Sequence, residues 1–158
     1  MAGGPVPPEA GRRGGASEGL RERRVSAEVH DGIVIATEHI QAAPEVVFRY
    51  FTDPALLTTW IGDLAELDPL PGGRFDLVMG DVRCRGTYLV VEPPHRVTFS
   101  WGIDGNRALP PAASTVEVVL TPDGDDTMVV LTHRGLPENR IEQHRAGWEH
   151  QLARLCRT

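Results

Sequence analysis

The stretch HRAGWEHQLARL, residues 144–155, decides the expected fold. At about 100° per residue it predicts an amphipathic helix that begins after Pro137 and runs to the C-terminus. Four large apolar residues share its narrow inward stripe: Ile141, Trp148, Leu152 and Leu155. Gly147 lies on the flank of that stripe, shared with His144 and Gln151. Because a glycine inside a helix costs roughly 1 kcal/mol relative to alanine, we expect a second backbone segment to pack closely at Gly147.

The chain ahead of this helix predicts a strand, two short helices and a meander of strands. Residues 43–51 and 54–61 predict the helices, since each carries a proline at its start. Alternating apolar residues between turn signals predict six strands, at residues 31–40, 72–79, 83–92, 96–102, 114–122 and 126–135. Pro93-Pro94 and Asp123-Gly124 lie where two hairpins are expected to reverse. The meander is therefore expected to be an antiparallel sheet.

Composition suits one soluble domain in the cytoplasm. The 158 residues are 41% hydrophobic with a net charge of -6, and all 16 basic residues are arginine, which hints at a GC-rich bacterial source. Residues 1–30 are rich in Gly, Pro and Arg and are expected to be a disordered tail, while residues 31–158 form the domain. The acidic balance argues against nucleic acid as a partner, and no apolar run is long enough for a membrane span. Cys84 and Cys156 are expected to be free thiols.

Four motifs carry a family resemblance: GGRF at 72–75, EPPHRVTFSW at 92–101, LTHRGLP at 131–137, and H-x-x-G-W-x-x-x-L-x-x-L at 144–155. Together they resemble the bacterial branch of the heat-shock protein 90 ATPase activator family, within the START-like (SRPBCC) superfamily. The resemblance spans about residues 31–155. It implies an α+β helix-grip fold, similar to that of the birch allergen. In that fold a curved antiparallel sheet wraps a long C-terminal helix and leaves a cavity between them.

Period-two alternation predicts which strand residues face the helix. We expect the cavity to be lined by Trp60, Phe75, Leu77, Met79, Phe99, Trp101, Val118, Leu131, His133, Trp148 and Leu152. Trp148 is expected to be partly core and partly cavity lining. The segment around Tyr88 is apolar on both faces, so its orientation stays open between a bulge and a partner surface. An apolar outer sheet face would also permit a homodimer.

The sequence predicts no metal site and no cofactor. His144 and His150 are six residues apart and so point about 120° away from each other on the helix, too far to share a metal. Two interpretations of His133 are open. It could lie at the cavity rim and act as an acid, a base or a ligand anchor, or its side chain could cap the turn at Gly135 with a hydrogen bond. We favour the capping role. Three acidic residues near Trp60 fit a solvated loop better than a catalytic carboxylate pair: Asp63, Glu66 and Asp68.

Three functions are compatible with these features. Binding of a small apolar or amphipathic molecule in the cavity ranks first, because the expected lining is apolar with few polar groups. The alternative is a cyclase- or aromatase-like enzyme. His133 and Tyr88 are the two residues that would support it, as sources of an acid or a base. A co-chaperone role follows from the family resemblance, although the eukaryotic activator uses a separate N-terminal domain where this chain has a short tail. We expect binding rather than catalysis.

Overall fold

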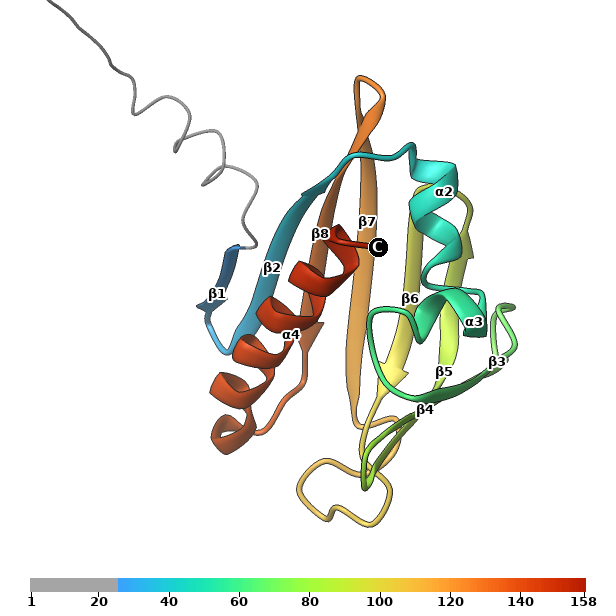
Figure 1. The fold of residues 1–158 in the computed structure, drawn as a ribbon. Helices are drawn as coiled ribbons and strands as arrows, with labels where there is room; N and C mark the ends of the chain where they lie inside the picture. The colour runs from blue at the N-terminus through green and yellow to red at the C-terminus, as the bar shows by residue number, and fades with distance from the viewer. Residues whose placement is uncertain (1–25) are drawn as a thin grey trace, which may run out of the picture.

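An open, curved antiparallel sheet of eight strands forms the body of the computed structural model, which describes residues 26–158 (Figure 1). Its strands follow the order β1 (Ser26–His30), β2 (Ile33–Ile40), β8 (Asp126–Arg134), β7 (Ser114–Asp123), β6 (Arg96–Trp101), β5 (Val82–Glu92), β4 (Arg74–Met79) and β3 (Leu64–Leu67). The meander from β4 to β8 is confirmed. Its turns fall at Pro93-Pro94 and after Asp123, as the turn signals predict.

Helices cover the concave face of this sheet. α4 (Ile141–Cys156) follows a single 3-10 turn, η1 (Glu138–Arg140), and packs across β2 and β1 (Figure 1). The two predicted short helices are α2 (Pro44–Arg49) and α3 (Pro54–Leu57), and both begin with proline. α2 lies against β7, and α3 lies against β3. The helix-grip architecture implied by the family resemblance is therefore the observed one.

The stripe of α4 that faces the sheet is the predicted one. Trp148, Leu152 and Leu155 are buried, and Ile141 packs against the edge of the core. The sheet contributes the alternating inward residues, among them Phe75, Leu77, Val97, Phe99, Trp101, Val116, Val118, Leu120, Val129, Leu131 and His133, all of which are buried. None of the helices within residues 26–158 has the length and apolar character that crossing a membrane requires.

Tyr88 points into the core, which settles its open orientation. Its hydroxyl donates a hydrogen bond of 2.9 Å to the carbonyl oxygen of Phe51, and the residue is fully buried. A β-bulge between Tyr88 and Val90 shifts the register with β6 and leaves Leu89 exposed. An extra residue in one strand turns the following side chains to the opposite face, so the apolar run can serve both faces.

Two strands were not predicted. β1 lies within residues 26–30, which we expected in the tail, and Asp31-Gly32 forms the hairpin turn that joins it to β2 instead of starting the fold. The predicted tail is otherwise residues 1–25, which lie outside the described residues. β3 occupies residues 64–67, expected to be a loop. Both are sheet edges with mostly exposed side chains, so neither carries the clear apolar alternation that reveals a strand.

Candidate functional site

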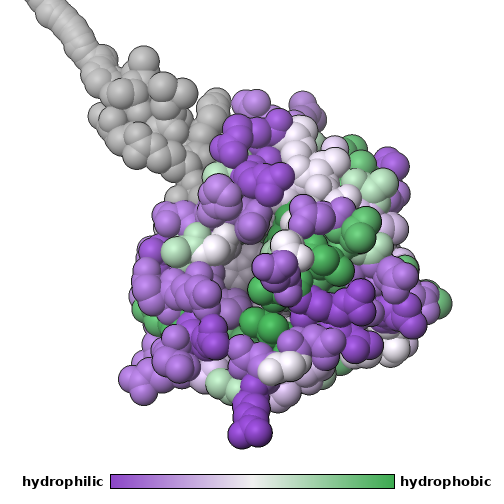
Figure 2. Space-filling view, turned by 60° about the horizontal axis from the view of Figure 1, so that its bottom comes forward, coloured by the Kyte–Doolittle hydropathy of each residue, from purple (hydrophilic) through white to green (hydrophobic). Residues whose placement is uncertain are grey.

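A pocket of about 220 Å³ opens between α4 and the β4–β5 hairpin. It is lined by Ile61, Met79, Val82, Cys84, Trp101, Ile103, Gln143, His144, Gly147, Trp148 and Gln151. The strand side of the lining is apolar, whereas α4 supplies all of the polar groups. Seen from the end of the molecule that carries the β4–β5 hairpin, the surface includes a hydrophobic patch enclosed by hydrophilic side chains (Figure 2).

A row of three residues on α4 shapes one wall of the pocket. Gln143, Gly147 and Gln151 are spaced four residues apart, so they lie in line along one flank of the helix. Apart from its two chain neighbours and the backbone of its own helix, a Cβ atom built on Gly147 would meet no atom within 4 Å. The expected close backbone approach at Gly147 is therefore wrong. The glycine forms a notch between two glutamines and leaves open space in the pocket.

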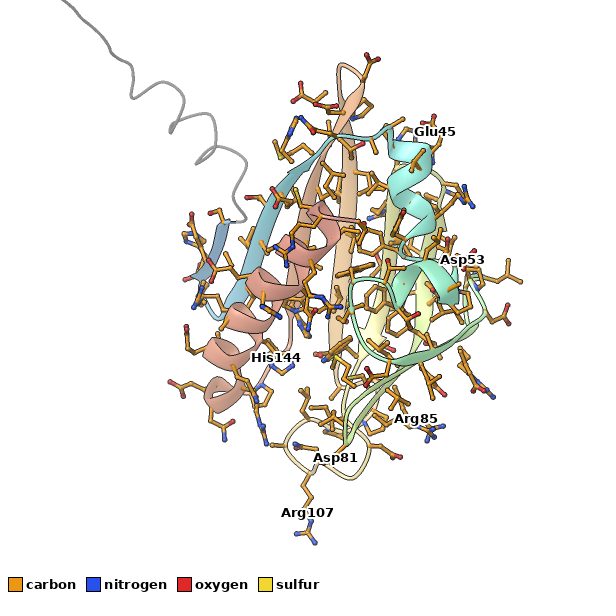
Figure 3. The ribbon with its side chains drawn as sticks, in the orientation of Figure 1. Glu45, Asp53, Asp81, Arg85, Arg107 and His144 are labelled. Carbon is orange, nitrogen blue, oxygen red and sulfur yellow. The ribbon has the colours of Figure 1, made fainter. Side chains whose placement is uncertain are left out.

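His144 joins this wall to the floor of the pocket. The indole Nε1 of Trp101 donates a hydrogen bond to His144 Nε2 at 3.3 Å, and His144 Nδ1 lies 2.9 Å from the carbonyl oxygen of Arg140. Because an indole N–H can only donate, Nε2 is the acceptor and Nδ1 carries the proton. Burial lowers the pKa of His144, which keeps the ring neutral. The ring lies on the side of α4 that faces the β4–β5 hairpin (Figure 3).

A second chain of hydrogen bonds runs beneath the pocket floor. Trp148 Nε1 donates to His133 Nδ1 at 2.9 Å, so His133 Nε2 carries the proton and donates to Ser114 Oγ at 2.8 Å. The Ser114 hydroxyl then donates to the carbonyl oxygen of Trp101 at 2.7 Å. Every polar atom of this buried chain has a partner. The chain ties α4 to the middle of the sheet.

His133 consequently fits neither of its two predicted roles. Its side chain has no exposed surface, so it does not lie at a cavity rim. Both ring nitrogens bind Trp148 and Ser114, so the ring does not cap the turn at Gly135. Burial, helped by the nearby His144 ring, lowers the pKa of His133 to about 3. His133 is a neutral structural histidine of the core.

This pKa predicts acid sensitivity. In the unfolded chain His133 takes up a proton near its ordinary pKa of 6.5, but in the folded protein it does so only near 3. Stability should therefore fall as the pH drops below 6.5, by about 2 kcal/mol between pH 7 and pH 5 from this residue. Urea unfolding of wild type and His133→Gln at both pH values measures it, because glutamine keeps an acceptor for Trp148 but does not titrate. An equal pH dependence in the two proteins would contradict the prediction.

The predicted cavity residues divide into two groups. Met79, Trp101 and Trp148 line the pocket. The other eight lie in the packed core and do not line it: Trp60, Phe75, Leu77, Phe99, Val118, Leu131, His133 and Leu152. Their assignment to the lining is corrected, because α2, α3 and α4 fill most of the sheet's concave face. An inward-facing side chain therefore lines the cavity only near the open end of the sheet. Elsewhere it packs in the core.

The lining residues that sequence reasoning missed come from three places. The flank of α4 contributes Gln143, His144, Gly147 and Gln151, and the interior glycine was the signal that marked this flank. Val82 and Cys84 share the inward face of β5 with Tyr88, an alternation that the unresolved orientation of Tyr88 concealed. Ile61 and Ile103 belong to irregular segments, for which period-two reasoning has no template.

Acid-base and metal chemistry have few candidates near the pocket. Burial raises the pKa of the Cys84 thiol to about 12, so it is not a ready nucleophile. Two of the three acidic residues near Trp60 serve structural contacts: Asp63 accepts a bond from the backbone of Gly80, and Glu66 pairs with Arg74 at 2.7 Å. Within residues 26–158, no three or more His, Cys, Asp or Glu residues are grouped to hold a metal ion.

Solved structures of other proteins have a similar fold. CalU16 from Micromonospora echinospora is 30% identical, with a TM-score of 0.65 over 85% of this chain and 82% of that one. DynU16, a protein of the dynemicin biosynthetic locus, is 25% identical, with a TM-score of 0.70 over 81% of this chain and 47% of that one.

The family relationship comes from sequence. The human activator of 90 kDa heat shock protein ATPase homolog 1 is 25% identical over 131 residues, which are 80% of this chain and 36% of the human protein. The chain thus spans about a third of the length of that relative. Residues 41–158 match the family model described as Activator of Hsp90 ATPase homolog 1-like protein. The protein belongs to the activator of Hsp90 ATPase homolog 1-like family.

Proposed function

We propose that this protein binds a small apolar or amphipathic molecule in the pocket between α4 and the β4–β5 hairpin. The observation that carries the proposal is the notch at Gly147. A helix accepts a residue that destabilises it by roughly 1 kcal/mol, and the vacant side-chain position opens onto an apolar wall instead of packing against protein. Such an arrangement is useful if another molecule occupies the space.

The lining supports binding. Seven of the eleven lining residues have apolar or sulfur-containing side chains, and the polar ones are confined to one wall: Ile61, Met79, Val82, Cys84, Trp101, Ile103 and Trp148 make up the apolar part. Ligand pockets typically combine an apolar majority with a few placed polar groups. The similarity to DynU16, from a biosynthetic locus, is in keeping with a small-molecule ligand.

Binding is favoured over catalysis by the state of the polar groups. Both nitrogens of His144 are engaged in hydrogen bonds, and the Cys84 thiol is protonated, so neither is poised to transfer a proton or attack a substrate. Activation of the Hsp90 ATPase is a second candidate, motivated by the family match. It stays a prediction for the whole protein, as do a homodimer and a cytoplasmic location.

Filling the notch tests the proposal. Gly147→Leu should place a side chain in the pocket and weaken binding of the neutral probe N-phenyl-1-naphthylamine at least tenfold, about 1.4 kcal/mol, measured by fluorescence titration. The fold should remain intact, because nothing lies within 4 Å of the added Cβ atom. Ala146→Leu, on the adjacent exposed position of α4, is the matched control and should bind the probe like wild type. Equal probe affinity in Gly147→Leu and wild type would rule out this pocket as the binding site.

A further inference from the structure

The pocket contains no charged side chain. Among the eleven residues that line it, none is acidic and none is arginine, and burial lowers the pKa of the one titratable imidazole, that of His144, so that this ring is neutral. An ion that entered this pocket would lose hydration without touching an opposite charge among the lining residues, which is unfavourable. The lining therefore selects for an uncharged molecule.

The two glutamines give the pocket a directional polar wall. The amide oxygen of Gln143 accepts a hydrogen bond from Arg140 Nη1 at 3.3 Å, and that of Gln151 accepts one from Arg154 Nη1 at 3.5 Å. Each oxygen already accepts one bond, whereas the two amide NH₂ groups donate to no other group of residues 26–158, so these donors are the groups most available to a ligand. A ligand group that matches them must be a hydrogen-bond acceptor.

The floor of the pocket is aromatic. The rings of Trp101 and Trp148 lie with their centroids 5.3 Å apart, and Met79 and Cys84 add polarizable sulfur atoms to the lining. Aromatic faces and sulfur atoms both favour contact with another aromatic ring. The volume of about 220 Å³ is below the roughly 300–1,000 Å³ of pockets for drug-sized ligands, so one or two rings fit best.

We propose that the pocket recognises an uncharged aromatic molecule of one or two rings that carries a carbonyl-type acceptor. The rings lie on the Trp101–Trp148 floor, the edge of the molecule enters the notch at Gly147, and the acceptor receives a hydrogen bond from the amide of Gln143 or Gln151. This inference rests on the proposed function and adds to it the chemical class of the ligand.

Three matched naphthalenes test the class. 2-Acetylnaphthalene carries the acceptor, 2-ethylnaphthalene has nearly the same shape without it, and 2-naphthoate replaces the ketone with a charge. Their affinities are measured by displacement of N-phenyl-1-naphthylamine. In wild type, 2-naphthoate should bind at least tenfold more weakly than the ketone. For each variant we take the ratio of the ketone affinity to the hydrocarbon affinity. Comparing this ratio between variants removes the difference in hydrophobicity between the two compounds, because that difference is the same in every variant.

The glutamine variants assign the donor. The preference for ketone over hydrocarbon should fall about fivefold, the effect of one hydrogen bond, in the single variant that removes the donor, either Gln143→Met or Gln151→Met. The double variant should show the same fall. Gln41→Met is the matched control, because Gln41 is exposed and is not among the residues that line the pocket, and its preference should match wild type. An unchanged preference in the double variant, or naphthoate binding as tightly as the ketone, would overturn the proposed ligand class while leaving apolar binding intact. Failure of all three compounds and of the probe to bind wild type would overturn the proposed function itself.

Discussion

Replacement of Trp148 by alanine is expected to lower the free energy of unfolding by about 4–8 kcal/mol. Removing a buried tryptophan from a core typically costs about 3–5 kcal/mol. The indole of Trp148 is 4% exposed and also donates the hydrogen bond that His133 Nδ1 accepts. Without it, a buried acceptor is left unpaired, which costs roughly 1–3 kcal/mol more. Because small domains are stable by only about 5–15 kcal/mol, much of this protein's stability would be lost.

Urea unfolding followed by circular dichroism measures the Trp148 effect, and Trp148→Phe separates its two components. Phenylalanine keeps most of the buried aromatic surface but cannot donate to His133, so its loss should be about 1–3 kcal/mol. A loss below about 2 kcal/mol for Trp148→Ala would show that Trp148 acts mainly as pocket lining. Similar losses for the alanine and phenylalanine variants would show that the hydrogen bond dominates over the packing.

Replacement of Gly86 by alanine is the second large effect, with an expected loss of about 3 kcal/mol. Gly86 lies in β5, where an added Cβ atom would overlap the carbonyl oxygen of Ser100 in β6. That neighbour is backbone within a paired strand, so the two strands must separate for the methyl group to fit. Tyr88, two residues along β5, would lose part of its buried packing and the alignment of its bond to Phe51.

Gly147→Ala is the matched comparison for Gly86→Ala. The same chemical change in α4 meets no neighbouring atom and improves helix propensity, so it should raise the free energy of unfolding by about 1 kcal/mol. Urea unfolding of both variants should therefore show changes in the free energy of unfolding of opposite sign for the same glycine-to-alanine substitution. A loss of stability in Gly147→Ala would indicate a close contact at the notch, and an unaltered stability in Gly86→Ala would indicate that β5 and β6 can separate freely.

Much of the fold was predictable because each element has a local cause. The proline starts predict α2 and α3, the alternation of apolar residues predicts β4 to β8, and the spacing of Trp148, Leu152 and Leu155 predicts the buried stripe of α4. Those patterns follow from the repeat of a helix or a strand, which a linear sequence displays directly. β1 and β3 escaped prediction because an edge strand buries too little to impose a pattern.

The sequence alone determined which side chains face the sheet's concave side in β4, β6, β7 and β8, and it marked the flank of α4 at Gly147 as unusual. Only the tertiary structure decided what that face encloses. Inward positions such as Phe99 and Leu131 became solid core, whereas Gly147 opened onto a pocket instead of a neighbouring backbone. The physical reason is that periodicity gives the direction of a side chain but carries no information on the distance to the element opposite. That distance is set by how α2, α3 and α4 together fill the curved sheet, a sum over contacts between residues far apart in the chain.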